Sequence, residues 1–163
     1  MKIKTTPQKY KICNKSILLS RNEMGVMKIE ADTHEEFNMA MGFVHAHDRM
    51  MQMFLVRTIS QGRLSECLKS DEETLAIDIF MREMGLYTEA QKEVEKLSKE
   101  AKDFLHSYSE GVNDYLKRYK TPFEFKLVGF KPEPWCAADT LVMVKIMSYI
   151  GLAQTQQGIE KCI

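Results

Sequence analysis

The stretch Ser98–Tyr119, SKEAKDFLHSYSEGVNDYLKRY, carries the most regular pattern in this chain. Its apolar side chains recur every three or four residues, which predicts an amphipathic helix with one packed stripe. The stripe consists of Ala101, Phe104, Leu105, Tyr108, Val112, Tyr115, Leu116 and Tyr119. Ser98 is a good N-cap for this helix. A glycine inside a helix costs about 1 kcal/mol relative to alanine, so at Gly111 we expect another helix to approach closely.

The first 30 residues are expected to contain short β-strands. Two β-type runs at 16–20 and 26–30 flank a short loop that contains Gly25, and this arrangement is typical of a hairpin. Residues 1–15 are basic and polar, and we expect an N-terminal arm or a peripheral strand there. Residues 16–163 are expected to form one domain, since the whole chain of 163 residues has the usual size of a single domain.

A long helix follows the expected hairpin. Thr33 can cap it, Glu36 stands at the capping-box position, and Gly62 ends it. Its apolar positions at helical spacing are Phe37, Met41, Val44, Met51, Phe54, Leu55 and Ile59. Further helices are expected over 64–68, over 72–84 before Gly85, and from Ala137 or Ala138 onward. The predicted fold class is therefore α+β, mostly helical with a short β-hairpin.

The composition argues against several classes of protein. Lysine and arginine together number 23, as do aspartate and glutamate, so no net charge points to nucleic acid or to an anionic membrane. The longest apolar runs are only a few residues, too short for a transmembrane helix or a signal peptide. We therefore expect a cytoplasmic protein, or a periplasmic one from which a signal has been removed. The four widely spread cysteines show no metal-ligand or disulfide pattern and are typical of free thiols.

The densest group of functional side chains is His45-Ala46-His47-Asp48-Arg49. The two histidines are two residues apart, so on a helix they point to different sides and cannot share a metal ion. His45 with Asp48 or Arg49 has suitable helical spacing, but such a pair would need further ligands from elsewhere. Asp48 lies on the expected apolar stripe, which predicts a buried carboxylate in an ion pair with an arginine or in a helix-cap contact. The candidate partners are Arg49, Arg57 and Arg63, and losing Asp48 would cost roughly 3–5 kcal/mol.

The run Pro122–Trp135, PFEFKLVGFKPEPW, holds three of the four prolines and the only tryptophan. Two X-Pro bonds close together stiffen a chain, so this segment is expected to act as a rigid connector. Nothing in it carries chemistry by itself, and Trp135 is therefore interpreted as a structural residue. Gly62-Arg63-Leu64-Ser65-Glu66 is likewise interpreted as a turn between two helices, because a phosphate-binding loop needs more glycine.

Five stretches together resemble the α chain of the penicillin acylase family of N-terminal nucleophile hydrolases. They occur in the family's order and cover roughly residues 16–160. The matching stretches are 21–26 with 29–33, the histidine-containing helix 41–53, the turn 62–66, the Y-x-x-G-V-N stretch 108–113, and the proline-rich run 122–135. One departure is visible, because this chain has Met27-Lys28 where relatives often read Pro-His.

The resemblance implies a subunit without a nucleophile. In this family a precursor cleaves itself into an α chain and a larger β chain, and the two together form an αββα fold. The nucleophile is the first residue of the β chain, and its own α-amine, with a pKa near 8, serves as the base. The resemblance thus implies no catalytic residue in this chain, a β chain from the same precursor as partner, and hydrolysis of the linear amide of N-acyl compounds. β-Lactam side chains and acyl-homoserine lactones are both possible substrates.

The resemblance also implies two roles for the last helix. Relatives place part of the acyl pocket there, which implies that Ile150, Ala153 and Gln154 contribute to it. Relatives often carry Asn-Arg in this region, whereas this chain has Leu152-Ala153-Gln154-Thr155-Gln156, so the substrate preference does not carry over. If Ile150 and its neighbours line the pocket, the acyl group should be apolar. They also place one calcium ligand near the end of that helix, which carries over to Glu160, and the alternative for Glu160 is a solvent-exposed helix glutamate without a ligand role. One carboxylate cannot hold calcium alone, so the β chain would supply the other ligands. No organic cofactor is implied.

Two alternatives stay open at this stage. The chain could be an inactive relative that serves as a binding or structural subunit, or an unrelated helical interaction domain that folds alone. A first residue of the β chain other than Ser, Thr or Cys would favour the inactive relative over the enzyme. An isolated chain that is soluble, monomeric and cooperatively folded would favour the free-standing domain.

Overall fold

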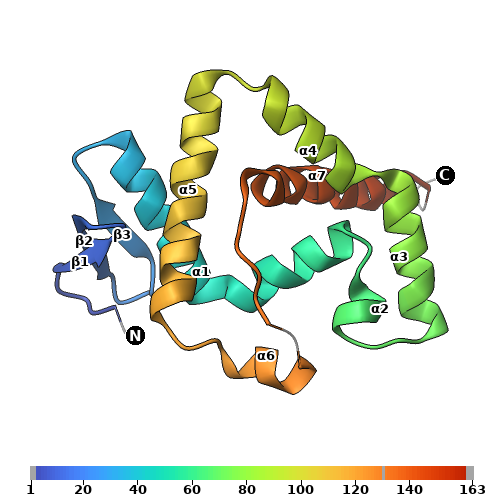
Figure 1. Cartoon of the computed structure of the whole chain (residues 1–163), viewed down its shortest axis with the longest axis horizontal. Coiled ribbons are helices and arrows are strands. Elements are labelled where there is room, and N and C mark those ends of the chain that lie inside the picture. Colours follow the sequence, from blue (N-terminus) through green and yellow to red (C-terminus); the bar gives the residue numbers. More distant parts are fainter. Residues whose placement is uncertain (1–2, 130, 161–163) are drawn as a thin grey trace. The chain divides into compact units, whose positions relative to one another are not determined.

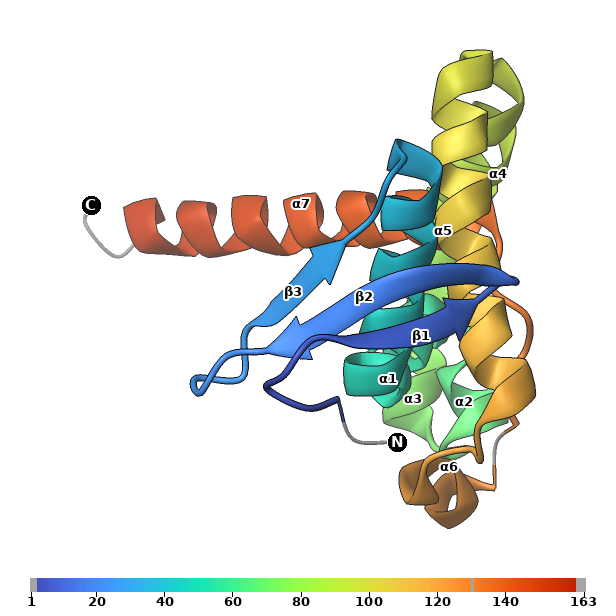
Figure 2. The same cartoon turned by 90° about the vertical axis from the view of Figure 1, so that its left-hand side faces the viewer.

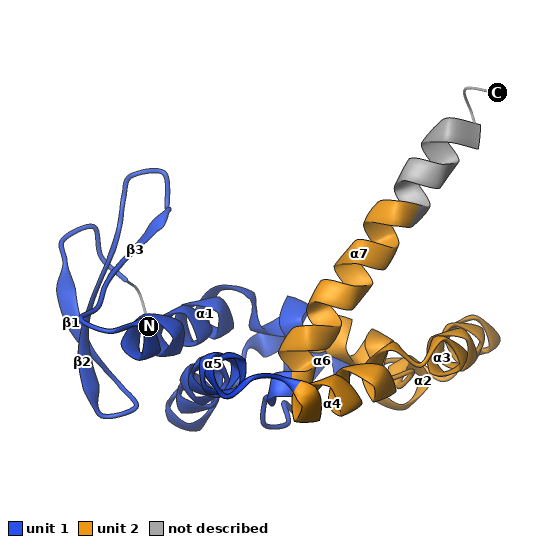
Figure 3. Ribbon diagram, turned by 90° about the horizontal axis from the view of Figure 1, so that it is seen from above, with its two compact units in different colours: residues 1–53, 97–137 blue, residues 54–96, 138–163 orange. Residues whose placement is uncertain are grey.

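A small antiparallel sheet precedes a series of helices in the computed structural model of this chain (Figure 1). The structure describes residues 3–129 and 131–160, and of 153–160 only the backbone. The described residues group into two compact units, 1–53 with 97–137 and 54–96 with 138–163 (Figure 3). Within the described ranges, no helix has both the length and the apolar composition needed to cross a bilayer. The predicted fold class, α+β and mostly helical, is confirmed.

The sheet contains three strands in the order β1-β2-β3. The strands are β1 (Gln8–Ile12), β2 (Lys15–Arg21) and β3 (Met27–Glu30), and both pairings are antiparallel. The expected hairpin corresponds to β2 and β3, and β1 comes from the segment expected to be an arm or peripheral strand. Cys13 and Asn14 turn the chain between β1 and β2 with positive φ values of 46° and 66°. Ile17 and Leu19 of β2 are buried, so one face of the sheet packs inward. Figure 2 shows the sheet beside the helices of the same unit.

Helix α1 (His34–Ser60) begins where the sequence predicts and contains a kink that the sequence did not predict. The Thr33 hydroxyl accepts a hydrogen bond from the Glu36 amide, while the Glu36 carboxylate accepts one from the Asp32 amide, one residue earlier than in a capping box. Arg49 interrupts the helix with φ −138° and ψ 22°. The predicted apolar stripe is only partly correct, since Val44 and Phe54 are buried while Phe37 is 38% exposed.

The buried positions of α1 include small residues that a search for large apolar side chains overlooks. Ala40, Phe43, Val44, Ala46, Met50, Met53 and Phe54 are all buried. Gly42 is buried as well, because it lies where α5 (Lys99–Arg118) crosses α1. A Cβ atom at Gly42 would lie 2.1 Å from the carbonyl oxygen of Tyr108. One at Gly111 would lie 1.9 Å from the carbonyl oxygen of Met39. The close helix approach predicted at Gly111 is therefore confirmed, with a second glycine on the other helix.

Aromatic rings surround the crossing within the same unit. The ring of Phe43 meets the edges of Tyr115 and Tyr119, with centroids 5.3 Å and 5.9 Å away. Such edge-to-face pairs add about 0.5–1.5 kcal/mol each beyond the area that they bury. The predicted N-cap of α5 is confirmed, since the Ser98 hydroxyl accepts a hydrogen bond from the Ala101 amide at 3.2 Å.

The second unit contains α2 (Leu64–Cys67), α3 (Glu72–Met84), α4 (Leu86–Lys96) and most of α7 (Ala137–Glu160). Helix α3 has the predicted bounds, because Asp71 and Thr74 form a capping box at its start and Gly85 ends it with a φ of 67°. Helix α4 was not predicted from the sequence. It is strongly charged and buries only Ala90, so its apolar signal is weak.

The proline-rich run is not an extended connector throughout. It contains α6 (Phe123–Val128), which ends at Gly129 with a φ of 69°. Phe125 is the buried residue of this helix, while Phe123 and Leu127 remain 68% and 71% exposed. The prolines flank the helix instead of straightening the segment, because Pro122 stands at its N-cap, where the lack of an N–H group costs nothing.

Gly111→Ala should lower the free energy of unfolding by about 2–3 kcal/mol, because a new Cβ would overlap the backbone of α1. Gly151→Ala is the matched control. Gly151 is also helical, but a Cβ there would meet no atom within 4 Å, so alanine should raise helix stability slightly. Urea denaturation followed by circular dichroism measures both variants. Equal midpoints would contradict the importance of the helix crossing.

Candidate functional site

The residues predicted to bind substrate and calcium all lie on α7. The first half of this helix is packed, since Ala138, Asp139, Val142 and Ile146 are buried. From Met147 to Leu152 every residue is exposed. Ile150 is 41% exposed and Leu152 is 71% exposed. The side chains of Ala153, Gln154 and Glu160 lie outside the described residues, so their predicted roles stay predictions.

This exposed end of α7 is unusual for a soluble helix, because apolar residues occupy most of its sides. Met147, Tyr149, Ile150 and Leu152 follow one another too closely to share a single stripe. A helix that is apolar all round is normally covered by other protein. Within the same unit, the ring of Phe80 on α3 lies 6.2 Å from that of Tyr149, and Phe80 is itself 44% exposed.

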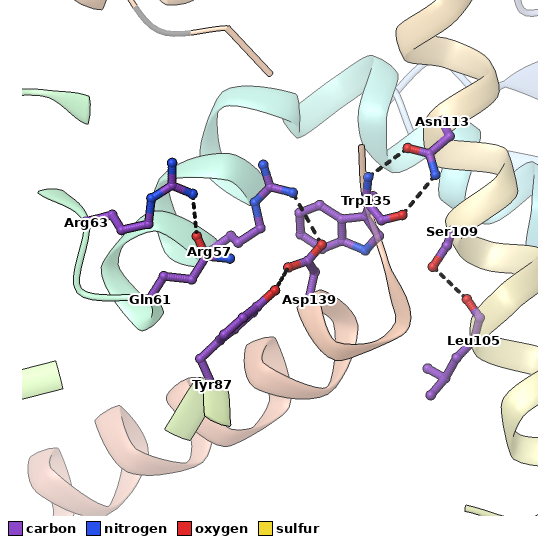
Figure 4. Close-up of polar contacts among 9 residues, drawn as sticks. All are labelled: Arg57, Gln61, Arg63, Tyr87, Leu105, Ser109, Asn113, Trp135 and Asp139. Atoms are coloured by element: carbon purple, nitrogen blue, oxygen red, sulfur yellow. Dashed lines mark hydrogen bonds and ion pairs between the residues drawn. The ribbon is translucent and has the colours of Figure 1, made fainter. Parts of the chain in front are cut away.

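The base of α7 is held by a buried charge cluster that sequence reasoning missed (Figure 4). Asp139 in the first turn accepts a hydrogen bond from the Arg57 guanidinium at 3.3 Å and another from the Tyr87 hydroxyl at 3.1 Å. The side chains of Arg57 and Asp139 are only 3% and 1% exposed. Arg57 also stacks on the ring of Phe54 at 4.2 Å. The only sign of this cluster in the sequence is that Asp139 stands in the first turn of a helix. Acidic residues are favourable at that position in exposed helices too, so the sign does not indicate burial.

The predicted burial and partners of Asp48 are wrong. Its carboxylate pairs with Arg21 of β2, whose guanidinium donates to Oδ2 at 2.6 Å, and with His47, whose Nδ1 lies 2.6 Å from Oδ1. The Asp48 side chain keeps 28% of its surface exposed and faces Arg21 of the sheet. Burial would raise the pKa of Asp48, but the hydrogen bonds from Arg21 and His47 lower it below its usual value. Arg49 itself is exposed at the kink.

Arg63 does have a structural role, although Asp48 is not its partner. Its guanidinium donates to both carboxylate oxygens of Glu66, at 2.9 Å and 2.7 Å. It also donates to the Gln61 side chain at 3.0 Å, as Figure 4 shows. The same turn is anchored by Asp78 of α3, which the sequence did not single out. The buried Asp78 carboxylate accepts from the backbone amides of Leu64 and Ser65 at 2.7 Å and 2.8 Å. The stretch 62–66 is thus a turn, as predicted.

Trp135 joins two of the stretches that carry the family resemblance. Its amide donates to Asn113 Oδ1 at 2.7 Å, and its carbonyl oxygen accepts from Asn113 Nδ2 at 2.9 Å (Figure 4). Asn113 ends the Y-x-x-G-V-N stretch on α5, and Trp135 ends the proline-rich run. The Trp135 side chain is buried, with 3% of the residue exposed. The structural interpretation of Trp135 therefore agrees with its contacts.

The remaining polar groups of the histidine cluster form contacts within the fold. His45 Nδ1 lies 2.9 Å from the Tyr108 hydroxyl, and burial raises the pKa of Tyr108 to about 12. Burial also lowers the pKa of His45, which opposes protonation of its ring. Among the described residues, no three His, Cys, Asp or Glu side chains are grouped so that they could hold a metal ion. On α5, the Ser109 hydroxyl donates to the Leu105 carbonyl oxygen at 2.8 Å (Figure 4).

A sequence model of penicillin amidase matches residues 17–160, nearly the whole chain. The chain belongs to the penicillin amidase family. Acyl-homoserine lactone acylase QuiP of Pseudomonas aeruginosa is 35% identical to it over 144 residues, which are 87% of this chain and 17% of that relative. Penicillin acylase 2 proenzyme of Pseudomonas sp. (strain SE83) is 38% identical over 137 residues, 83% of this chain and again 17% of the relative.

A solved structure extends the similarity to three dimensions. A thermostable penicillin G acylase from Alcaligenes faecalis matches with a TM-score of 0.72 and 25% sequence identity. The match covers 90% of this chain and 83% of the matched chain. This penicillin amidase chain spans only 17% of the full length of each of the two curated relatives named above.

Asp48→Asn should weaken folding by roughly 1–2 kcal/mol at pH 7, since the Arg21 and His47 contacts lose their charged acceptor. The folded-state pKa of Asp48 is depressed, so its contribution is complete above the ordinary pKa of 3.8 and is lost as the pH falls through the lower folded value. The difference from the unmodified chain should therefore shrink below about pH 4. Asp103→Asn, at a carboxylate that is 67% exposed, is the control and should have little effect at either pH. A difference that stays constant with pH would contradict the assignment.

Asn113→Ala should lower the free energy of unfolding by about 2–4 kcal/mol, because it removes the partner of both the amide and the carbonyl of Trp135. Asn113→Asp should lose about half as much, since a carboxylate can still accept from the Trp135 amide but cannot donate to its carbonyl oxygen. Thermal unfolding of both variants, followed by tryptophan fluorescence, tests this order. Equal losses would show that the paired hydrogen bonds do not hold the segment.

Proposed function

We propose that this chain is the α chain of an amidohydrolase that cleaves the linear amide of N-acyl compounds, with its nucleophile on a larger β chain. The observation that carries the proposal is the match of residues 17–160 to the penicillin amidase model, together with the TM-score of 0.72 to a chain of a penicillin G acylase. One of the relatives is named a penicillin acylase proenzyme, which supports cleavage of a precursor into two chains.

The surface of α7 supports a partner of this kind. Four large apolar side chains between Met147 and Leu152 are exposed, and covering them would remove apolar area from water at about 25 cal/mol per Å². In our proposal, the β chain covers this end of the helix. The proline-rich run precedes α7, and the side chain of Asn113 holds its end through two hydrogen bonds to the Trp135 backbone. In our proposal, this connection helps to place α7 against the β chain.

The proposed substrate has an apolar acyl group. Penicillins and acyl-homoserine lactones, named in the two curated relatives, both join an acyl group to an amine through a linear amide. Ile150, Ala153 and Gln154 are our proposed contributions to the acyl pocket. An exposed isoleucine offers dispersion contacts and no hydrogen bond, so it suits an alkyl or aryl chain.

The chemical step in this proposal belongs to the β chain. An N-terminal hydroxyl or thiol residue attacks the amide carbonyl while its own α-amine, with a pKa of about 8, takes the proton. The α chain binds and orients the acyl group. Calcium stays a prediction on Glu160, and because calcium takes six to eight oxygen ligands, the β chain would supply most of them.

The decisive experiment expresses the full precursor and measures the intact mass of its products. We expect two chains, with Ser, Thr or Cys at the start of the larger one, and release of homoserine lactone from N-dodecanoyl homoserine lactone or of 6-aminopenicillanic acid from penicillin G. A single uncleaved chain would contradict the subunit assignment. A different first residue, or the absence of amine release, would favour an inactive binding subunit.

Ile150→Asp should lower kcat/KM for the dodecanoyl substrate about tenfold or more, because a carboxylate desolvated beside an alkyl chain is unfavourable. Leu127→Asp, at an apolar residue on α6 that is 71% exposed, is the matched control and should retain the unmodified rate. Steady-state rates of amine release measure both variants. An unaffected Ile150→Asp enzyme would remove this residue from the pocket.

A further inference from the structure

We infer that Asp139, Arg57 and Tyr87 are positioning residues that aim the free end of α7, and thereby set which acyl chains the enzyme accepts. The inference rests on the proposed function of α7. None of the three residues belongs to the stretches that carry the family resemblance. Each comes from a different helix of one unit, since Arg57 lies on α1, Tyr87 on α4 and Asp139 on α7.

Asp139, Arg57 and Tyr87 hold the first turn of α7 in place. Asp139 receives hydrogen bonds on both carboxylate oxygens, from Arg57 on Oδ2 and from Tyr87 on Oδ1. Two donors from different helices define the position and the rotation of the carboxylate together, which one donor cannot do. Arg57 is itself held from its other side by the ring of Phe54 at 4.2 Å.

The packing of α7 shows why the position of this first turn matters. Its buried apolar residues are Ala138, Val142 and Ile146, about one helical turn apart, and no residue from Met147 to Leu152 is buried. Figure 3 shows α7 running past α4 of the same unit. The buried contacts that orient the exposed part are therefore those of the first three turns, while the Phe80–Tyr149 ring contact farther along α7 is partly exposed.

A small tilt at the base of α7 produces a larger displacement at its exposed end. Ile150 follows Asp139 by eleven residues, which is about 16 Å along the helix at a rise of 1.5 Å per residue. A tilt of about 5° at the base then moves Ile150 by about 1.5 Å. Displacements of about 1 Å at a reacting substrate can change rates by roughly a hundredfold. A small change at Asp139 is thereby amplified where the acyl chain binds.

A surface contact on the same helix provides a matched control. Lys145 of α7 pairs with Glu93 of α4 at 2.8 Å, so it also joins these two helices, but its side chain is 27% exposed and that of Glu93 is 47% exposed. Exposed pairs of this kind hold geometry weakly because water competes for both groups. Lys145→Met should therefore leave the direction of α7 unchanged.

The test uses the processed enzyme and the ratio of kcat/KM for N-dodecanoyl over N-butanoyl homoserine lactone. Asp139→Asn and Tyr87→Phe should change this ratio about tenfold and about threefold, because a tilted α7 alters the depth of the acyl pocket. Lys145→Met should not change it. A role in stability alone would lower the fraction of active enzyme and reduce kcat equally for both substrates. An unchanged ratio in Tyr87→Phe would overturn the inference, even if Asp139→Asn does not fold.

A second readout does not depend on hydrolysis. The photo-crosslinker p-benzoylphenylalanine at position 150 should attach α7 to the larger chain, and Asp139→Asn or Tyr87→Phe should reduce the yield while Lys145→Met retains it. Crosslinking that responds in this way without amine release from any variant would remove the proposed hydrolysis and leave the positioning role standing. Equal yields in all four proteins would overturn the positioning role.

Discussion

The first unit depends on the place where α1 and α5 cross with their backbones in contact. Gly42 and Gly111 make this possible, since a Cβ on either would lie about 2 Å from a carbonyl oxygen of the other helix. The crossing fixes what each helix carries. Helix α1 brings Asp48 to Arg21 of the sheet, and α5 brings Asn113 to the backbone of Trp135. Replacing either glycine would change both connections at once.

The two ion pairs of α1 differ in their physical consequences. Asp48–Arg21 precedes the kink and keeps about a quarter of each side chain in water, so it contributes modestly and responds to pH. Arg57–Asp139 follows the kink and is almost fully buried. A buried pair gives little net stability, but it is costly to break and it defines geometry. The second pair is therefore suited to orienting α7, and the first to attaching the sheet.

The stretches that identify the family are mainly structural in this chain. Gly111, Asn113, Trp135 and Arg63 form a helix crossing, a paired hydrogen bond and a turn. None of these contacts performs chemistry, which fits a chain whose proposed catalytic partner lies elsewhere. The part of α7 that we propose to meet substrate consists instead of ordinary exposed apolar residues. Membership in the penicillin amidase family thus indicates the scaffold more directly than it indicates the substrate.

The sequence by itself determined the elements with strong local signals. Periodicity and caps located α3 and α5, and Gly111 predicted a close helix contact. Only the tertiary structure decided which charges pair, because Arg21 and Asp48 are 27 residues apart and Arg57 and Asp139 are 82 residues apart in the chain. Helix α4 also needed the tertiary structure, since it buries little apolar surface of its own. Local patterns encode helices and turns, whereas long-range pairing follows from how those helices pack.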